Sequence, residues 1–237
     1  MKLVLFDIDG TLLWTDGAGR RAVYRALHEV YGVPAPDGHE FDGKTDPQIV
    51  RELMTRAGTS EHDVETHLPR AIARYVEELR AELGDADHGD KVYPGIRALL
   101  DALEARDDVV LGLLTGNVHE GAAAKLAAVG IDARRFRVGA FGSDHADRPE
   151  LPAIARRRAE VLLGCPIAGR DVVVIGDTPA DMSCGRGIGA LAVGVATGSY
   201  SVEQLDIARA GIVFADLSDT DAVVAAVMAP HGQPGAP

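Results

Sequence analysis

Two aspartates, Asp7 and Asp9, follow an apolar run at the start of the chain, within the segment DIDGT. With a single isoleucine between them, the two carboxylates are aimed at one small volume, where their like charges repel each other. A nearby cation must therefore compensate them. Paired carboxylates can supply a nucleophile and a general acid–base, and their oxygens are also ligands for a divalent metal ion.

Two later segments carry similar chemistry. Thr115-Gly116-Asn117 and Gly176-Asp177-Thr178-Pro179-Ala180-Asp181 each follow an apolar run. Taken singly, such segments are ordinary turns or helix starts. Because ligands of open α/β sheets bind beyond the carboxyl ends of the strands, the three segments together predict one site at one edge of a sheet.

The elements that would position these residues alternate between strands and helices. Near-continuous apolar runs suit strands that are buried on both faces of a parallel sheet. Clear runs cover 2–7, 109–116 and 171–177, and weaker ones cover 136–141, 190–196 and 212–215. Helical patterns lie near 95–106, 118–129, 150–164, 179–187, 201–209 and 218–228. The predicted fold class is α/β, with a doubly wound, Rossmann-like parallel sheet as its core.

The alternation is interrupted between Trp14 and Val92, where the patterns are helical and no strand is convincing. Three helices are expected there, over 17–32, 46–58 and 67–84, followed by a linker over 85–95. The predicted division is an α/β core of 1–15 and 93–228, an inserted α-helical cap domain of 16–92, and a disordered tail of 229–237.

Composition excludes several classes of protein. The 237-residue chain has 24 basic and 36 acidic residues, a net charge of -12, and no basic run, so a nucleic-acid partner is not expected. The two cysteines do not form a disulfide framework or a zinc motif. No signal peptide or membrane span is evident, and a cytoplasmic location is the default. Nothing in the sequence specifies an oligomeric state.

The motifs resemble those of the haloacid dehalogenase superfamily of phosphohydrolases, in the branch with a small α-helical cap that includes phosphoglycolate phosphatase-like and β-phosphoglucomutase-like proteins. The resemblance rests on Asp7-Ile8-Asp9-Gly10-Thr11, on Thr115, and on Gly176-Asp177 with Asp181 four residues later. It spans nearly the whole chain, because the helical segment lies where these proteins carry their cap.

The resemblance implies a role for each motif. Asp7 would attack phosphorus to form an aspartyl-phosphate, and Asp9 would protonate the leaving oxygen and then activate water. Thr115, with the backbone amides of Gly116 and Asn117, would bind the phosphoryl oxygens.

A donor set of oxygens without His or Cys favours Mg²⁺ over Zn²⁺. By resemblance, the side chains of Asp7 and Asp177 and the backbone carbonyl of Asp9 would be ligands. Asp181 would bind the metal or hold one of its waters.

One departure from the superfamily pattern concerns its fixed cation, which is usually a lysine in the loop after the next strand. Here the corresponding segment has Arg148-Pro149, so Arg148 is the candidate. Arginine stays charged and can grip phosphate with two donors, although a solvated loop arginine is an equal alternative. Lys125 and Arg158 are set aside because they lie about seven or eight residues inside their helices, roughly 10–12 Å from the sheet edge.

Substrate recognition is expected from the inserted helices. Their polar loop FDGKTD (41–46) would place Lys44 and Thr45 near the leaving group, although this segment is equally a simple helix start. The helix arginines, Arg20 among them, are interpreted as solvated positions.

The leading hypothesis is a magnesium-dependent phosphatase that acts on a small phosphorylated metabolite. A phosphomutase that shares the aspartyl-phosphate is the first alternative, and a protein that binds a phosphorylated ligand without turnover is the second. A dehalogenase is disfavoured, because a halide leaving group needs no proton and Asp9 would then have no role.

Overall fold

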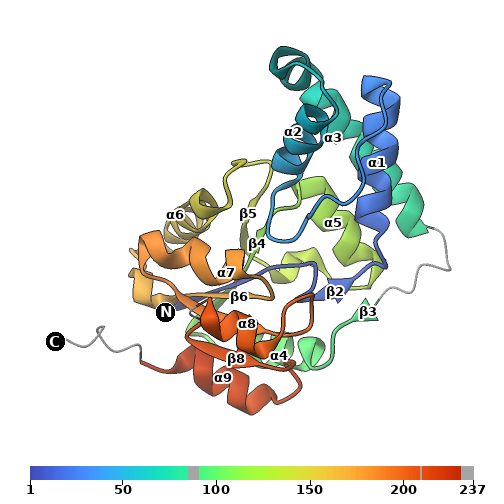
Figure 1. Ribbon diagram of the computed structural model, residues 1–237. Helices are drawn as coiled ribbons and strands as arrows, with labels where there is room; N and C mark the ends of the chain where they lie inside the picture. The colour runs from blue at the N-terminus through green and yellow to red at the C-terminus, as the bar shows by residue number, and fades with distance from the viewer. Residues whose placement is uncertain (85–90, 209, 231–237) are drawn as a thin grey trace.

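The computed structural model of the protein describes residues 1–84, 91–208 and 210–230 (Figure 1). Its core is a parallel sheet of six strands in the order β5-β4-β1-β6-β7-β8, which confirms the predicted fold class. The strands are β1 (Lys2–Phe6), β4 (Val109–Thr115), β5 (Val138–Phe141), β6 (Val172–Gly176), β7 (Leu191–Val195) and β8 (Ile212–Phe214). Because β1 pairs with both β4 and β6, the segments that follow these three strands meet at one edge.

Helices cover both faces of the sheet, and this explains why its central strands are almost entirely apolar. Val4 and Phe6 of β1 pack with residues of α4, α5 and α9, whereas Leu3 and Leu5 pack with residues of α6 and α7 on the other face. The core helices are α4 (Ile96–Glu104), α5 (His119–Ala128), α6 (Leu151–Leu163), α7 (Pro179–Cys184), α8 (Val202–Ile207) and α9 (Thr220–Met228). Each such fully buried side chain stabilises the fold by about 1.5–3 kcal/mol.

Three helices between β2 (Leu13–Trp14) and β3 (Lys91–Val92) form a helical insertion with its own apolar core. They are α1 (Ala18–Tyr31), α2 (Asp46–Arg56) and α3 (Glu61–Gly84). Leu27, Leu53 and Leu79, one from each helix, are completely buried among them. Figure 1 shows this unit standing above the carboxyl edge of the sheet.

Helix α3 begins at Glu61, six residues before the predicted start, and contains Pro69. Proline removes one helical hydrogen bond, which is why the sequence favours a later start. The earlier turns are nevertheless helical, with Val64 buried in the same cluster as Tyr75. Tertiary packing thus overrides the local preference.

A small antiparallel sheet that the sequence did not predict joins the insertion to the core. It consists of β2 (Leu13–Trp14) and β3 (Lys91–Val92), with Leu13 opposite Val92. Most of the predicted linker and all but two residues of the predicted tail lie outside the described residues, so the domain limits stay a prediction. Within the described ranges, no helix is both long and apolar enough to cross a bilayer.

Candidate active site

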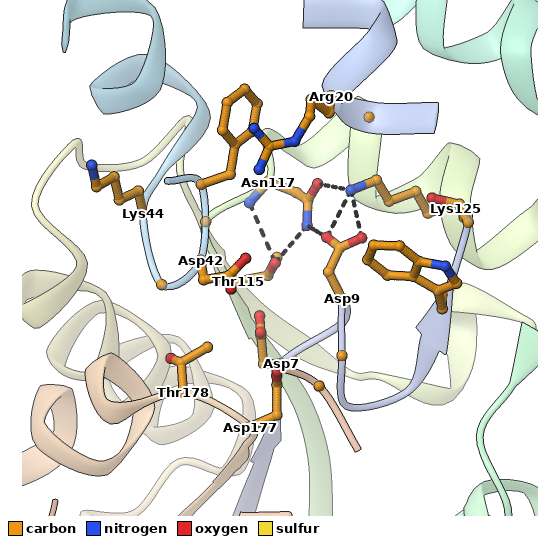
Figure 2. A pocket seen from close by; sticks show the side chains of 18 of the residues that line it. Asp7, Asp9, Arg20, Asp42, Lys44, Thr115, Asn117, Lys125, Asp177 and Thr178 are labelled. Atoms are coloured by element: carbon orange, nitrogen blue, oxygen red, sulfur yellow. Dashed lines mark hydrogen bonds and ion pairs between the residues drawn. The ribbon is translucent and has the colours of Figure 1, made fainter. Parts of the chain in front are cut away.

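A cavity of about 360 Å³ lies between the carboxyl edge of the sheet and the helical insertion (Figure 2). The core contributes Asp7, Asp9, Thr115, Asn117, Arg148 and Asp177 to its lining. The insertion contributes Arg20, Phe41, Lys44, Asp46 and Tyr75. The residues that follow the strands therefore line one cavity, as predicted, and the helical insertion covers it.

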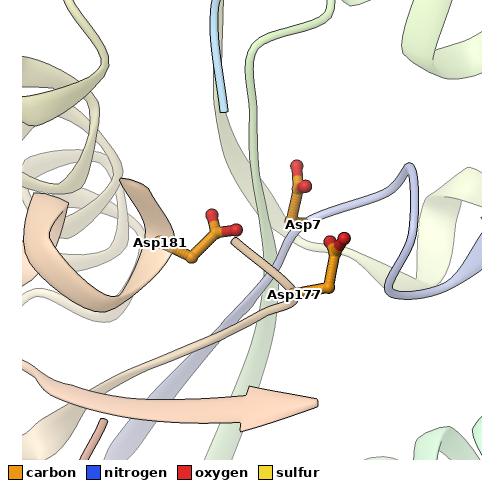
Figure 3. Close-up of side chains that lie close together, drawn as sticks. All are labelled: Asp7, Asp177 and Asp181. Atoms are coloured by element: carbon orange, nitrogen blue, oxygen red, sulfur yellow. The ribbon is translucent and has the colours of Figure 1, made fainter. Parts of the chain in front are cut away.

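Three aspartates form a buried cluster at the bottom of this site (Figure 3). Asp7 follows β1, Asp177 follows β6 and Asp181 lies in α7, and one carboxylate oxygen of each lies within 4.8 Å of the others. Burial raises the pKa of Asp7 to about 7, opposed by Arg148 and reinforced by Asp181. Burial, and then the charges of Asp181 and Asp7, raise the pKa of Asp177 well above its usual value. Both carboxyls are thus harder to ionise than a free aspartate.

Local hydrogen bonds explain how the chain holds this cluster. The hydroxyl of Thr11 donates to Asp177 Oδ1 at 3.0 Å, and Gly10 adopts φ +80°, where a side chain would overlap the Asp177 carboxylate. At the start of α7, Thr178 and Asp181 form a reciprocal capping box. The Gly-Thr and Thr-Pro-Ala-Asp patterns are therefore structural supports for the carboxylates.

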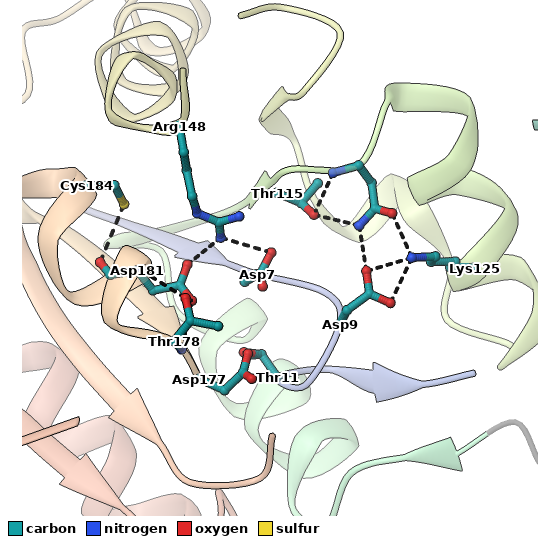
Figure 4. Close-up of polar contacts among 11 residues, drawn as sticks. Asp7, Asp9, Thr11, Thr115, Lys125, Arg148, Asp177, Thr178, Asp181 and Cys184 are labelled. Atoms are coloured by element: carbon teal, nitrogen blue, oxygen red, sulfur yellow. Dashed lines mark hydrogen bonds and ion pairs between the residues drawn. The ribbon is translucent and has the colours of Figure 1, made fainter. Parts of the chain in front are cut away.

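Arg148 supplies the fixed positive charge of the cluster (Figure 4). It begins the 3-10 turn η2 (Arg148–Glu150) just before α6, and its Nη2 lies 3.2 Å from Asp7 Oδ1 and also contacts Asp181 Oδ1. The side chain is buried. Burial lowers its pKa, but the charges of Asp181 and Asp7 raise it more, so the guanidinium stays charged. The structure thus places Arg148 where the sequence located the fixed cation.

The carboxylate of Asp9 lies apart from the cluster and belongs to a different network (Figure 4). It accepts hydrogen bonds from Lys125 Nζ at 2.7 and 2.8 Å and from Asn117 Nδ2 at 2.7 Å. Asn117 Nδ2 also donates to Thr115 Oγ1 at 2.8 Å. The side chain of Asn117, and not only its backbone, therefore connects Asp9 with Thr115.

The placement of Lys125 corrects the sequence argument that set it aside. Counting residues from the helix start ignored the direction of the side chain, because helical side chains lean toward the N-terminus and a lysine adds several ångströms of reach. The sequence does carry a signal, since Lys125 shares the buried face of α5 with Ala122 and Leu126. Arg158, by contrast, pairs with Asp144 and does not line the cavity.

The loop before α2 closes against the core through its backbone. A Cβ at Gly116 would overlap the carbonyl of Lys44, and the amide of Asp46 donates to the carbonyl of Gly116 at 2.8 Å. A Cβ at Gly43, which adopts φ +73°, would lie 2.6 Å from the Cβ of Ala180. The loop therefore touches the segments that follow both β4 and β6.

The side chains of Lys44 and Thr45 make other contacts than those the sequence suggested. Lys44 Nζ lies 2.5 Å from Glu52 Oε2, and Figure 2 shows it pointing away from Asp7. Thr45 Oγ1 donates to the carbonyl of Ala146 at 2.6 Å and caps α2. The structure does not bring the ammonium of Lys44 or the hydroxyl of Thr45 to the aspartate cluster.

Two residues of the insertion line the cavity without having been singled out as ligands. Asp46 Oδ2 accepts from the amide of Val118 at 2.7 Å, and burial raises the pKa of Asp46 to about 7. Arg20 donates to the carbonyl of His39 at 2.7 Å and lies 4.1 Å above the ring of Phe41. Arg20 is exposed to solvent, as the sequence suggested, and it also lines the cavity.

Comparison with protein families agrees with this geometry. Residues 1–189 match the model of the haloacid dehalogenase-like hydrolases, so the chain belongs to this family and is a hydrolase. The resemblance indicated by the motifs is thus confirmed. Among curated proteins, no sequence matches the chain significantly.

Solved structures extend the likeness over nearly the whole chain. A hydrolase from Pseudomonas syringae has a TM-score of 0.70 at 22% identity, covering 96% of this chain and 99% of that one. A protein described as a predicted phosphoglycolate phosphatase from Haemophilus somnus has a TM-score of 0.68 at 21% identity, covering 94% and 98%. A β-phosphoglucomutase from Clostridium difficile has a TM-score of 0.67 at 18% identity, covering 92% of each chain. At these identities the likeness shows a common fold.

Proposed function

We propose that the protein is a magnesium-dependent phosphatase that hydrolyses a small phosphorylated metabolite through an aspartyl-phosphate on Asp7. The observation that carries this proposal is the convergence of Asp7, Asp177, Asp181 and Arg148 at the bottom of the site, with Asp9 in a separate network at the cavity wall. Two solved relatives have names that denote phosphoryl chemistry, which supports the choice.

The residues divide the reaction into two steps. A carboxylate oxygen of Asp7 attacks phosphorus while the bond to the leaving oxygen breaks, and Asp9 gives its proton to that oxygen. Water then attacks the phosphorus of the aspartyl-phosphate, gives a proton to Asp9, and releases phosphate and the free Asp7 carboxylate. Arg148 stays charged throughout, and with Thr115 it would bind the phosphoryl oxygens.

The donor set fits a magnesium ion. Asp7, Asp177 and Asp181 offer carboxylate oxygens within 4.8 Å of one another, and burial, with the neighbouring carboxylates, raises the pKa values of Asp7 and Asp177, so that a further cation would favour their ionised forms. A bound ion would neutralise the phosphoryl oxygens and hold them facing Asp7. The backbone carbonyl of Asp9 stays a predicted further ligand.

The cavity supports a small substrate. Its volume of about 360 Å³ is at the low end of ligand pockets, and the helical insertion forms its roof. We interpret the insertion as a cap that limits the access of water. Contacts of the substrate with Lys44, Thr45 and the amides of Gly116 and Asn117 stay predictions, as does a cytoplasmic location.

The first test is phosphate release from p-nitrophenyl phosphate and from a panel of small phosphomonoesters. We expect turnover with Mg²⁺ and its loss in EDTA, restored by excess Mg²⁺. Release that is absent, or that EDTA leaves unchanged, would contradict the proposal. Transfer of the phosphoryl group back to sugar, seen in product analysis with a bisphosphorylated sugar, would favour a phosphomutase.

A further inference from the structure

Lys125 is a buried lysine whose ammonium group reaches the proposed acid–base residue. Its Nζ lies 2.8 Å from Oδ1 and 2.7 Å from Oδ2 of Asp9, and 2.7 Å from Oδ1 of Asn117. The side chain of Lys125 is 6% exposed and that of Asp9 is 37% exposed. The cation is therefore fixed within the fold, while the carboxylate that it holds is accessible from the cavity.

Asn117 makes the pair part of a rigid network. Its Nδ2 donates to Asp9 and to Thr115 Oγ1, and its Oδ1 accepts from Lys125. Both sides of the amide are thus engaged, which fixes its orientation. A displacement of Lys125 would consequently shift the Asp9 carboxylate, both through their direct contact and through Asn117.

The helical insertion covers the ammonium from the other side. A Cβ at Gly19 in α1 would lie 3.3 Å from Lys125 Nζ, so the helix packs directly over the charge. Where water is excluded in this way, an ion pair is stronger than at the surface. The absence of a side chain at Gly19 leaves room for the lysine.

We propose that Lys125 is a positioning residue for Asp9. It holds the Asp9 carboxylate at the cavity wall and balances its charge. This inference rests on the proposed function, and it concerns both proton transfers: the one from Asp9 to the leaving oxygen and the one from water to Asp9. Lys125 itself would touch neither the phosphoryl group nor the nucleophile.

The test compares two substrates of nearly equal shape whose leaving groups differ in their need for a proton. p-Nitrophenolate leaves readily as an anion, whereas phenolate is more basic and benefits from general acid catalysis. In Lys125→Met, we expect first-turnover release of phenol from phenyl phosphate to fall by about 10- to 100-fold, because general acid catalysis as a whole supplies about 10²–10⁴-fold. First-turnover release of p-nitrophenol should change much less, so that a burst precedes slow steady-state turnover.

The matched control is Lys2→Met. Lys2 is also a buried lysine paired with an aspartate, Asp171, but it lies at the opposite end of β1. We expect this variant to treat both substrates as the wild type does. If Lys125→Met unfolds, as judged by circular dichroism, Lys125→Gln removes the charge, keeps a donor, and should show the same difference between substrates.

Equal losses on the two substrates, or no loss on either, would overturn the role of Lys125 while leaving the phosphatase intact. If the wild-type protein released neither phenol nor p-nitrophenol, and no phosphate from the wider panel, the proposed function would fail first and the inference with it. The two failures are thus distinguished by the wild-type assay.

Discussion

Asp7 and Asp9 are separated by one residue, yet their side chains differ in burial and in the charges around them. Asp7 is buried beside Asp177 and Asp181, with Arg148 as the cation that contacts it. Asp9 is more exposed, and both of its oxygens are held by Lys125. One half of the site therefore has an excess of negative charge, whereas the other half contains a closed ion pair.

This difference in surroundings indicates that the two carboxylates have different chemical roles. The half around Asp7 needs a further cation to be fully ionised, so it is suited to a metal ion and an anionic phosphoryl group. In the half around Asp9, Lys125 balances the charge of the carboxylate. The Asp9 side chain therefore needs no metal ion beside it for its proposed proton transfers. Substitutions at Asp7, Arg148 and Asp46 test this division.

Asp7→Asn should abolish turnover. Without a nucleophile, kcat is expected to fall by about 10⁴-fold or more. Because burial raises the pKa of Asp7, a neutral amide there should leave thermal stability in EDTA unchanged or higher. Steady-state hydrolysis of p-nitrophenyl phosphate and thermal unfolding measure the two effects, and wild-type activity in this variant would refute the assignment of the nucleophile.

Arg148→Met should cost both activity and stability. It leaves Asp7 and Asp181 buried without their cation, so the free energy of unfolding in EDTA should fall by about 3–5 kcal/mol and kcat by about 10²–10³-fold. Arg148→Lys keeps the charge and should recover part of each loss. Urea unfolding and kinetics provide the measurements, and a variant as stable as the wild type would contradict the charge imbalance.

Asp46→Asn should have the smallest effect, seen as a change in the pH dependence of stability. Burial raises the pKa of Asp46 to about 7, so between its unfolded value and about pH 7 the folded chain binds more protons than the unfolded chain. The free energy of unfolding of the wild type consequently decreases with pH in this window. Relative to the wild type, Asp46→Asn should therefore gain roughly 2–4 kcal/mol between about pH 5 and about pH 8.

Urea unfolding of both proteins at the two ends of this range gives the difference directly. The amide oxygen of asparagine can still accept from Val118, so the helix start at α5 should be preserved. A stability difference that is the same at both pH values would show that Asp46 does not titrate in this window.

Strand ends account for most of what the sequence could predict. Apolar runs located the central strands, and the rule that parallel strands end at one edge placed Asp7, Thr115 and Asp177 together. Arg148 could be placed because it lies in a loop just before a helix, where position along the chain nearly equals position in space.

The contacts that the sequence did not predict depend on side-chain direction and on packing between distant segments. Lys125 reaches Asp9 by running back along α5, and Lys44 turns to Glu52, eight residues away on the following helix. Asp46 forms a helix start, as expected, but its burial arises only because the insertion closes on the core. The only feature of the local sequence that indicates such contacts is a charged residue on the buried face of a predicted helix.

Gly116 has a consequence for the junction between the insertion and the sheet. The carbonyl of Lys44 occupies the space in which any other residue would place its first side-chain carbon. The contact is therefore between main-chain atoms of both segments. It requires glycine at position 116, because any side chain there would overlap the Lys44 carbonyl. An alanine at this position would therefore force the carbonyl of Lys44 away and loosen the contact between the insertion and the end of β4.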